Sequence, residues 1–142
     1  MKTVRDILKI KGSAVWNVAI GATVFEALRL MAEKEVGALV VMDDKRIAGI
    51  ISERDYARKI VLLGRTSPNT RVEEIMSSQV VYTHPDQFIE ECMAIMTDRR
   101  IRHLPVIEEG KLVGIISIGD LVKTIISEQK FTIEQLERYI SG

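Results

Sequence analysis

The sequence predicts a mixed α/β (α+β) fold in which two β-α-β-β-α units pack with pseudo-twofold symmetry. The motif Gly-Ile-Ile-Ser-x-x-Asp begins at Gly49 and returns 65 residues later at Gly114. At that offset, residues 24–61 (the first repeat) align with residues 89–126 (the second repeat), and ten of the 38 pairs are identical. In both repeats a helical pattern precedes two short apolar runs that are typical of buried strands. A period this long with only two copies indicates a symmetric pair rather than a solenoid.

In the first repeat, residues 17–20 are expected to be extended, and Thr23 is a good N-cap for a helix that ends near Glu35. Residues 38–42 and 47–51 are predicted to be a strand and its return strand, joined by a turn. A second helix is expected after Ser52, with Gly64 close to its end. The second repeat has the same order. An extended segment is expected at 80–83, a helix at 87–100, strands at 104–107 and 112–116, and a helix after Ser117.

Two segments lie outside the repeat. Residues 3–10 are predicted to be a short helix whose apolar positions are echoed by residues 72–76. Residues 132–135, Thr-Ile-Glu-Gln, form a capping-box pattern that predicts the start of a separate terminal helix. We therefore expect a first unit with the N-terminal helix, a linker, a second unit and a terminal helix, with the boundaries 1–64, 65–71, 72–127 and 128–142.

The terminal helix carries an apolar stripe that needs a surface to cover. Its members are Ile133, Leu136, Tyr139 and Ile140. The two candidates for that surface are the chain's own N-terminal helix and a second copy of the chain. We expect a homodimer, because a twofold dimer buries the same stripe on both chains at once.

Composition and charge limit the function. The chain has 142 residues, 46% of them apolar, and its twenty basic and twenty acidic side chains leave no formal net charge. That balance excludes a generally basic nucleic-acid-binding protein. One cysteine cannot form an internal disulfide, and with two histidines it is too little for a confident metal site. Without a signal peptide or an apolar run of membrane-spanning length, we expect a cytoplasmic protein that binds no metal, nucleic acid or membrane.

The repeated motif is the clearest candidate site, because it stands where a buried strand becomes a helix. A helix N-terminus offers free N–H groups to an anion, and the glycine permits close backbone approach. Ser52 and Ser117 can donate to a phosphate or sugar, while Asp55 and Asp120 can accept from the two hydroxyls of a ribose. Ser-x-x-Asp is also a capping box, and a duplicated sequence duplicates its caps. The residues alone leave ligand binding and capping both open.

A charged pair, Arg102 and His103, precedes a buried strand of the second repeat. It either points phosphate-binding groups into a cleft or is a solvated helix end. The matching residues of the first repeat are Gly37 and Ala38, so the two clefts are expected to be unequal. Arg54 beside Asp55 either binds a phosphate or only flanks the helix start. The sequence contains no recognisable catalytic set, and we predict no catalytic residue and no enzyme.

The motif, its spacing and its repetition, with Arg-His-Leu-Pro-Val at residues 102–106, resemble a tandem pair of CBS domains, or Bateman module. The resemblance covers residues 4–126. It implies two clefts between the units and a regulatory ligand such as AMP, ADP, ATP, NAD or S-adenosylmethionine. By resemblance, the ribose and phosphate residues are Ser52, Arg54, Asp55, Arg102, His103, Ser117 and Asp120. Arg102 and His103 would reach the nucleotide held by the opposite unit. The adenine side would be formed by Val18, Ala19, Ile20, Gly37, Ala38, Val81 and Thr83.

The resemblance implies a stand-alone regulatory sensor that binds an adenosine nucleotide and signals to a separate protein. The alternative is a structural dimerisation or scaffold protein that uses no nucleotide. The sequence names neither the nucleotide nor the regulated partner. It does not say whether both clefts fill, or whether Trp16 covers a cleft or lies at a dimer contact.

Overall fold

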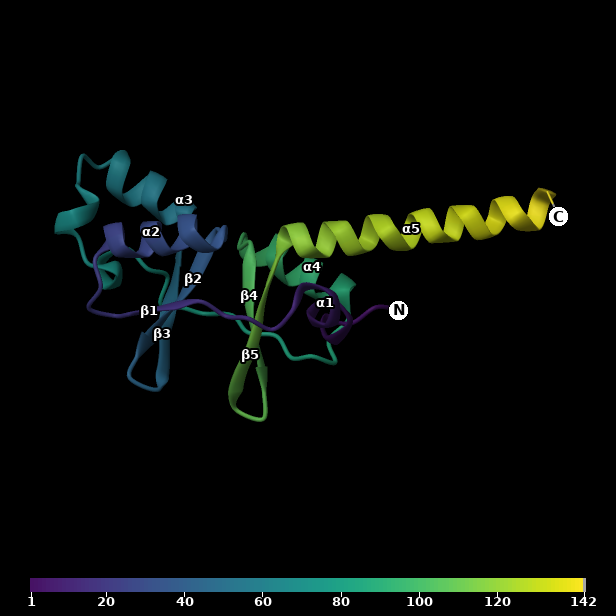
Figure 1. Cartoon of the computed structure of the whole chain (residues 1–142), viewed down its shortest axis with the longest axis horizontal. Coiled ribbons are helices and arrows are strands. Elements are labelled where there is room, and N and C mark those ends of the chain that lie inside the picture. The colour runs from purple at the N-terminus through teal and green to yellow at the C-terminus, as the bar shows by residue number, and fades with distance from the viewer. Residues whose placement is uncertain (142) are drawn as a thin grey trace. The chain divides into compact units, whose positions relative to one another are not determined.

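The computed structural model describes residues 1–141 and divides into two compact units (Figure 1). Residues 15–81 form one of them, which we call the central unit. Residues 1–14 group with residues 82–141 in the other, which we call the terminal unit. The N-terminal helix, expected beside the first repeat, therefore packs with the second repeat.

The central unit is built on a three-stranded sheet of order β1-β2-β3. Strand β1 (Asn17–Ala19) runs parallel to β2 (Ala38–Asp43), which pairs antiparallel with β3 (Arg46–Ser52). Helix α2 (Val24–Lys34) connects β1 to β2, and α3 (Glu53–Tyr56) follows β3 and continues as a π-type turn, Ala57–Val61. Two short 3-10 segments, Ser67–Asn69 and Val72–Glu74, complete the unit.

The terminal unit repeats this order with one difference. It contains α1 (Val4–Lys11), α4 (Ile89–Arg99), the antiparallel pair β4 (His103–Glu108) and β5 (Lys111–Ser117), and α5 (Ile118–Ser141). The strand expected at 80–83 is reduced to a single parallel bridge between Thr83 and Val106. The cause is Pro105, which occupies the place of Val40. The N–H of Val40 donates to Trp16 O at 3.3 Å, and proline has no N–H to donate.

The helix ends follow the predicted caps. The side chain of Thr23 accepts a hydrogen bond from the backbone N–H of Glu26 at 3.2 Å. Helices α2 and α4 end at matching residues, Glu35 and Arg100, which both have a φ of 55° in the left-handed region. The two repeats therefore stop their first helices in the same way.

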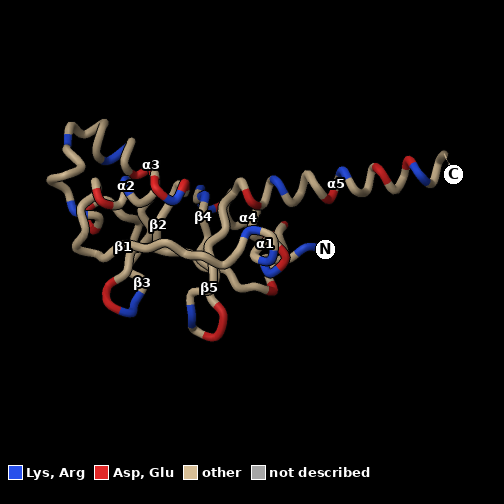
Figure 2. Tube along the Cα trace, viewed as in Figure 1, with Lys and Arg blue, Asp and Glu red and all other residues tan. Residues whose placement is uncertain are grey.

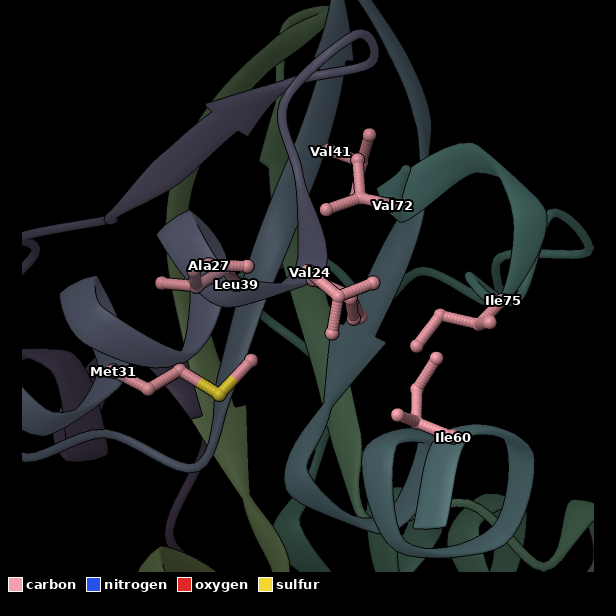
Figure 3. Close-up of a cluster of buried hydrophobic side chains, with 9 residues drawn as sticks. Val24, Ala27, Met31, Leu39, Val41, Ile60, Val72 and Ile75 are labelled. Carbon is pink, nitrogen blue, oxygen red and sulfur yellow. The ribbon is translucent and has the colours of Figure 1, made fainter. Parts of the chain in front are cut away.

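Each unit closes its core with a segment from outside its repeat. In the central unit, Val72 and Ile75 pack among the buried side chains of the first repeat (Figure 3). In the terminal unit, the matching residues Val4 and Ile7 come from α1 and are 0% and 3% exposed. Six further buried positions correspond in the two units: Val24, Ala27, Met31, Leu39, Val41 and Ile51 with Ile89, Cys92, Met96, Leu104, Val106 and Ile116. Cys92, at the place of Ala27, is thus a small buried hydrophobe.

The glycines of the repeated motif stand where these closing segments cross the sheet. A Cβ at Gly49 would lie 2.5 Å from Ser77 O, and one at Gly114 would lie 2.6 Å from Leu8 Cδ2. The closing segment of the central unit also pairs with β3, because Ile50 N donates to Ser77 O at 3.0 Å and Ser77 N donates to Ile50 O at 2.9 Å. The close approach that these glycines permit is therefore made by the protein itself.

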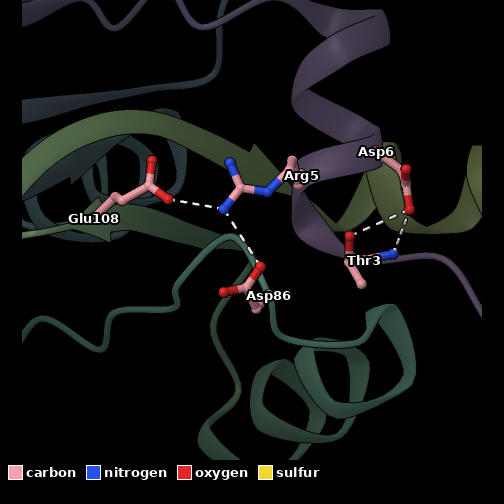
Figure 4. A network of polar contacts seen from close by, with 5 residues as sticks. All are labelled: Thr3, Arg5, Asp6, Asp86 and Glu108. Atoms are coloured by element: carbon pink, nitrogen blue, oxygen red, sulfur yellow. Dashed lines mark hydrogen bonds and ion pairs between the residues drawn. The ribbon is translucent and has the colours of Figure 1, made fainter.

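Polar contacts fasten α1 to the terminal unit (Figure 4). The guanidinium of Arg5 lies 2.8 Å from a carboxylate oxygen of Glu108 and 3.3 Å from one of Asp86. At the start of the helix, Thr3 N donates to Asp6 Oδ2 at 2.9 Å. Exposed ion pairs contribute little to stability, so the buried side chains of α1 remain the main attachment.

Helix α5 is one continuous helix from Ile118 to Ser141, which corrects the expected separate helix beginning near Thr132. The hydroxyl of Thr132 does not act as an N-cap, since it donates to Glu128 O at 3.0 Å, one turn earlier. Residues 120–141 contain no glycine or proline to end the first helix. Every side chain from 129 to 141 is exposed, so the apolar stripe does not fold back on α1.

Candidate functional site

In the central unit, the repeated motif forms a capped turn between β3 and α3. Ser52 N donates to Asp55 Oδ2 at 2.9 Å, and Asp55 N donates to Ser52 Oγ at 3.2 Å. The ammonium of Lys59 lies 3.4 Å from the other carboxylate oxygen of Asp55 and donates to Ile75 O at 2.8 Å. The turn is therefore preformed before any ligand arrives.

The terminal unit forms the same turn between β5 and α5. Ser117 N donates to Asp120 Oδ2 at 2.8 Å, and Asp120 N donates to Ser117 Oγ at 3.2 Å. Lys11 of α1 donates to the same Asp120 oxygen at 2.7 Å. The capping interpretation of Ser-x-x-Asp is thus confirmed in both units.

The carboxylates of Asp55 and Asp120 keep acceptor positions that the caps do not use. The side chains of Asp55 and Asp120 are 18% and 21% exposed. A carboxylate has about four acceptor positions on its two oxygens. Each turn can therefore still accept hydrogen bonds from a sugar.

Arg102 and His103 lie beside the turn of their own unit. His103 is opposite Ser117 in the β4–β5 register, and Arg102 O accepts from Ile118 N at 2.9 Å. In the central unit, Ala38 is opposite Ser52 and Gly37 O accepts from Glu53 N at 3.1 Å. The backbone geometry is the same in both units, while the charged pair is present only in the terminal unit.

The charges of the terminal turn are linked. Burial of His103, together with the positive charges of Lys11 and Arg102, lowers the pKa of its imidazole below 6.5, although Asp120 opposes the shift. His103 is therefore neutral at neutral pH. Burial tends to raise the pKa of Asp120, but its bonds to Lys11 and Ser117 outweigh burial and leave that pKa lowered. The cations of this turn at neutral pH are Lys11 and Arg102.

The residues expected on the adenine side lie at matching places, since Val18 is opposite Val41 and Thr83 is opposite Val106 in parallel pairing. Val18 and Ala19 lie in β1, at the edge of the three-stranded sheet, and Ile20 N donates to Met42 O at 2.9 Å. The backbone of Thr83 is bonded on both sides, because its N–H donates to Pro105 O at 3.0 Å and its carbonyl accepts from Ile107 N at 2.9 Å. The Thr83 hydroxyl donates to Gln87 and is buried. The backbone of Thr83 therefore has no free group to offer a base.

Sequence reasoning missed two lysines. Lys59 is four residues after Asp55 on the same helical segment, a spacing at which opposite charges meet, so the sequence did contain its signal. Lys11 is 109 residues from Asp120, and no local pattern joins them. Arg54 lies half-buried in α3, where its guanidinium forms no ion pair with the described residues. Trp16, 39% exposed, lies under the ammonium of Lys34, which is 4.4 Å from the ring centroid.

The described residues offer little for a metal site, a surface of one charge or a membrane span. Within residues 1–141, no three His, Cys, Asp or Glu side chains lie together in a way that could hold a metal ion. Figure 2 shows basic and acidic residues mixed along α5 and at the hairpin turns. None of the described helices has an apolar stretch long enough to cross a membrane.

Comparison with known proteins identifies the family. The model of the CBS domain matches residues 4–62 and 72–127. The chain belongs to the CBS-domain family. CBS-domain pairs of this kind are generally regulatory. A solved structure of a protein with CBS domains from Burkholderia ambifaria is 54% identical, with a TM-score of 0.86 over 90% of this chain and 96% of that one.

Two further relatives broaden the comparison. CBS domain-containing protein CBSX3, mitochondrial, from Arabidopsis thaliana is 38% identical over 99% of this chain and 72% of its own length. The CBS domain pair of protein MJ0100, solved in complex with 5′-methylthioadenosine and S-adenosyl-L-methionine, is 22% identical with a TM-score of 0.77, over 90% of this chain and 98% of that one. The likeness to MJ0100 is one of fold.

Proposed function

We propose that this CBS-domain pair is a regulatory sensor that binds an adenosine nucleotide at its strand-to-helix turns and signals to a separate protein. The observation that carries the proposal is the pair of matching turns. Each presents a Ser–Asp pair and a partly exposed carboxylate at the first turn of a helix. A ribose offers two adjacent hydroxyls, which a single carboxylate can accept together. MJ0100, which has the same fold, holds adenosine compounds.

In this proposal, Ser52 with Asp55 and Ser117 with Asp120 bind the ribose. The adenine side includes Val18, Ala19 and Ile20 in the central unit, where β1 is an edge strand. Val81 and Thr83 complete the proposed adenine side, where the backbone N–H and carbonyl of Thr83 are already hydrogen-bonded. Arg102 supplies a phosphate contact that Gly37 cannot match. The two sites are therefore expected to differ in their affinity for a nucleotide. The candidate nucleotides are AMP, ADP, ATP and NAD.

Conservative substitution of each aspartate tests this proposal. Asp55→Asn and Asp120→Asn keep an acceptor for the cap but remove the charge. Each should weaken one site about ten- to a hundredfold, the effect of losing about 1.5–3 kcal/mol from charge-assisted hydrogen bonds. Calorimetric titration with AMP, ADP, ATP and NAD measures the effect. Glu90→Gln, at an exposed position in the first turn of α4, is the matched control and should bind like the wild type.

The result also decides between sensor and scaffold. Binding that weakens in the aspartate variants, but not in the control, supports the sensor. If none of the four nucleotides binds at millimolar concentration, the sensor proposal is wrong and the scaffold alternative stands.

We also propose a homodimer held partly by α5. Beyond Lys130 the helix exposes an apolar stripe in which Ile133, Leu136 and Ile140 are 56%, 56% and 83% exposed. These residues are three and four apart, and Ile126 lies seven residues before Ile133, as in the heptad repeat of a coiled-coil seam. A second copy of the same helix is the simplest surface that covers the seam on both chains.

A further inference from the structure

One contact of the terminal turn comes from outside the second repeat. The ammonium of Lys11, at the end of α1, donates to Asp120 Oδ2 and to Ile115 O, both at 2.7 Å. The Lys11 side chain is 33% exposed, so part of it is covered by the protein. Asp120 is the residue that would bind a ribose in the proposed function. The ligand and Lys11 must therefore share one carboxylate.

In the central unit, a lysine from the same helical segment contacts the aspartate of the turn. Its lysine, Lys59, stands on the same helical segment as Asp55, at a longer distance of 3.4 Å, and is 44% exposed. The second repeat has Thr124 at the place of Lys59, and the Thr124 hydroxyl donates to the Asp120 carbonyl at 2.9 Å. Lys11 thus replaces a missing lysine from a distant part of the chain, at a shorter distance from the carboxylate.

The partners of Lys11 determine what a ligand has to supply. A neutral nucleoside that takes hydrogen bonds from its ribose to Asp120 weakens the Lys11 pair and offers the ammonium no negative charge in return. A partly buried cation that loses its counter-charge costs free energy. A ligand with a phosphate group brings a new anion for Lys11, so the exchange of partners costs less. His103 is neutral and cannot take over this role.

We infer that Lys11 is a specificity-determining residue, which makes the terminal turn select phosphorylated adenosine ligands over the neutral nucleoside. The inference rests on the proposed function. It extends that function by assigning the selection to a residue of α1, outside both repeats. The central turn, in which Lys59 lies 3.4 Å from Asp55, discriminates less.

The test compares AMP with adenosine at the terminal turn. Calorimetric titrations are made on the full chain carrying Asp55→Asn, which weakens the central site, with and without Lys11→Gln. Lys11→Gln should improve adenosine binding and weaken AMP binding, so that the preference for AMP falls about tenfold or more. Lys11→Arg keeps the charge and should retain the preference. Lys59→Gln in the Asp120→Asn background is the matched control and should change the preference less than about threefold.

The outcomes separate this inference from the proposed function. If AMP binds and Lys11→Gln and Lys11→Met both leave the preference within about twofold of the parent protein, Lys11 is not the selector and only this inference fails. If neither AMP nor adenosine binds the unsubstituted chain, the Asp55→Asn protein or its Lys11 variants at millimolar concentration, the proposed function fails and this inference fails with it. Equal thermal unfolding temperatures of the parent and Lys11→Gln proteins show that the fold is intact.

Discussion

Gly49→Ala and Gly114→Ala are matched substitutions with unequal expected costs. An added Cβ at Gly49 meets the backbone oxygen of Ser77 at 2.5 Å and Met76 Sδ at 2.9 Å. At Gly114 it meets only Leu8, at 2.6 Å from Cδ2 and 3.2 Å from Cδ1. A leucine side chain can rotate away, whereas a backbone carbonyl that is itself hydrogen-bonded to β3 cannot move alone.

The magnitudes follow from these contacts. Overpacking costs about 1–3 kcal/mol. Retreat of Ser77 also stretches its two backbone hydrogen bonds with Ile50, each worth about 1 kcal/mol. Gly49→Ala should therefore destabilise the protein by about 2–4 kcal/mol and Gly114→Ala by about 1 kcal/mol. With an m-value of about 2 kcal/mol/M, the urea midpoint should fall by about 1–2 M for Gly49→Ala and by about 0.5 M for Gly114→Ala.

Urea unfolding followed by circular dichroism measures both costs. The fluorescence of Trp16, the single tryptophan, reports the central unit in which Gly49 lies. Leu8→Ala should remove the cost of Gly114→Ala in the double variant, while Met76→Ala should leave most of the cost of Gly49→Ala. Equal costs for the two glycine substitutions, or full rescue of Gly49→Ala by Met76→Ala, would refute the backbone-clash argument.

Two further outcomes are expected. The folded protein disfavours protonated His103, mainly through burial, so stability should be complete above the ordinary histidine pKa of 6.5 and decline as the pH falls below it. The drop in unfolding temperature between neutral pH and about pH 5.5 should be smaller in His103→Asn than in a control variant of the exposed His84, and equal drops would contradict this assignment. For α5, a double change of Ile133→Glu and Ile140→Glu should lower the light-scattering mass from dimer to monomer at low micromolar concentration, whereas Lys130→Gln should not. A dimer mass in the double variant would assign the interface to another part of the chain.

The order of helices and strands could be predicted because it depends on the apolar spacing within each repeat, which is a local pattern. Residues close in the chain were enough to predict the strands around Leu39 and Leu104 and the cap at Thr23. The prediction of a full strand at 80–83 was wrong, because only a single bridge forms there. The pairing needs a backbone N–H that Pro105, more than twenty residues away, does not have.

The candidate site was only partly predictable for a similar reason. The Ser–Asp turns are four-residue motifs, and both form as capped turns. The Lys11 pair joins the two ends of the sequence, and no spacing rule connects residues that far apart. The unbroken α5 was missed because a capping-box pattern at Thr132 does not stop a helix that has no glycine or proline between residue 120 and Thr132.

The segments that complete the two cores, residues 72–77 in the central unit and α1 in the terminal unit, set an order of events during synthesis. Residues 15–81 contain every buried side chain of the central unit, so that unit can fold as soon as it has left the ribosome. Helix α1 is made before the central unit, yet the strands and helices it covers begin about eighty residues later, at Ile89. Until then its apolar face, with Val4 and Ile7, has no native partner. Contacts of such long sequence separation form slowly, and this makes the docking of α1 the expected late step in folding of the terminal unit.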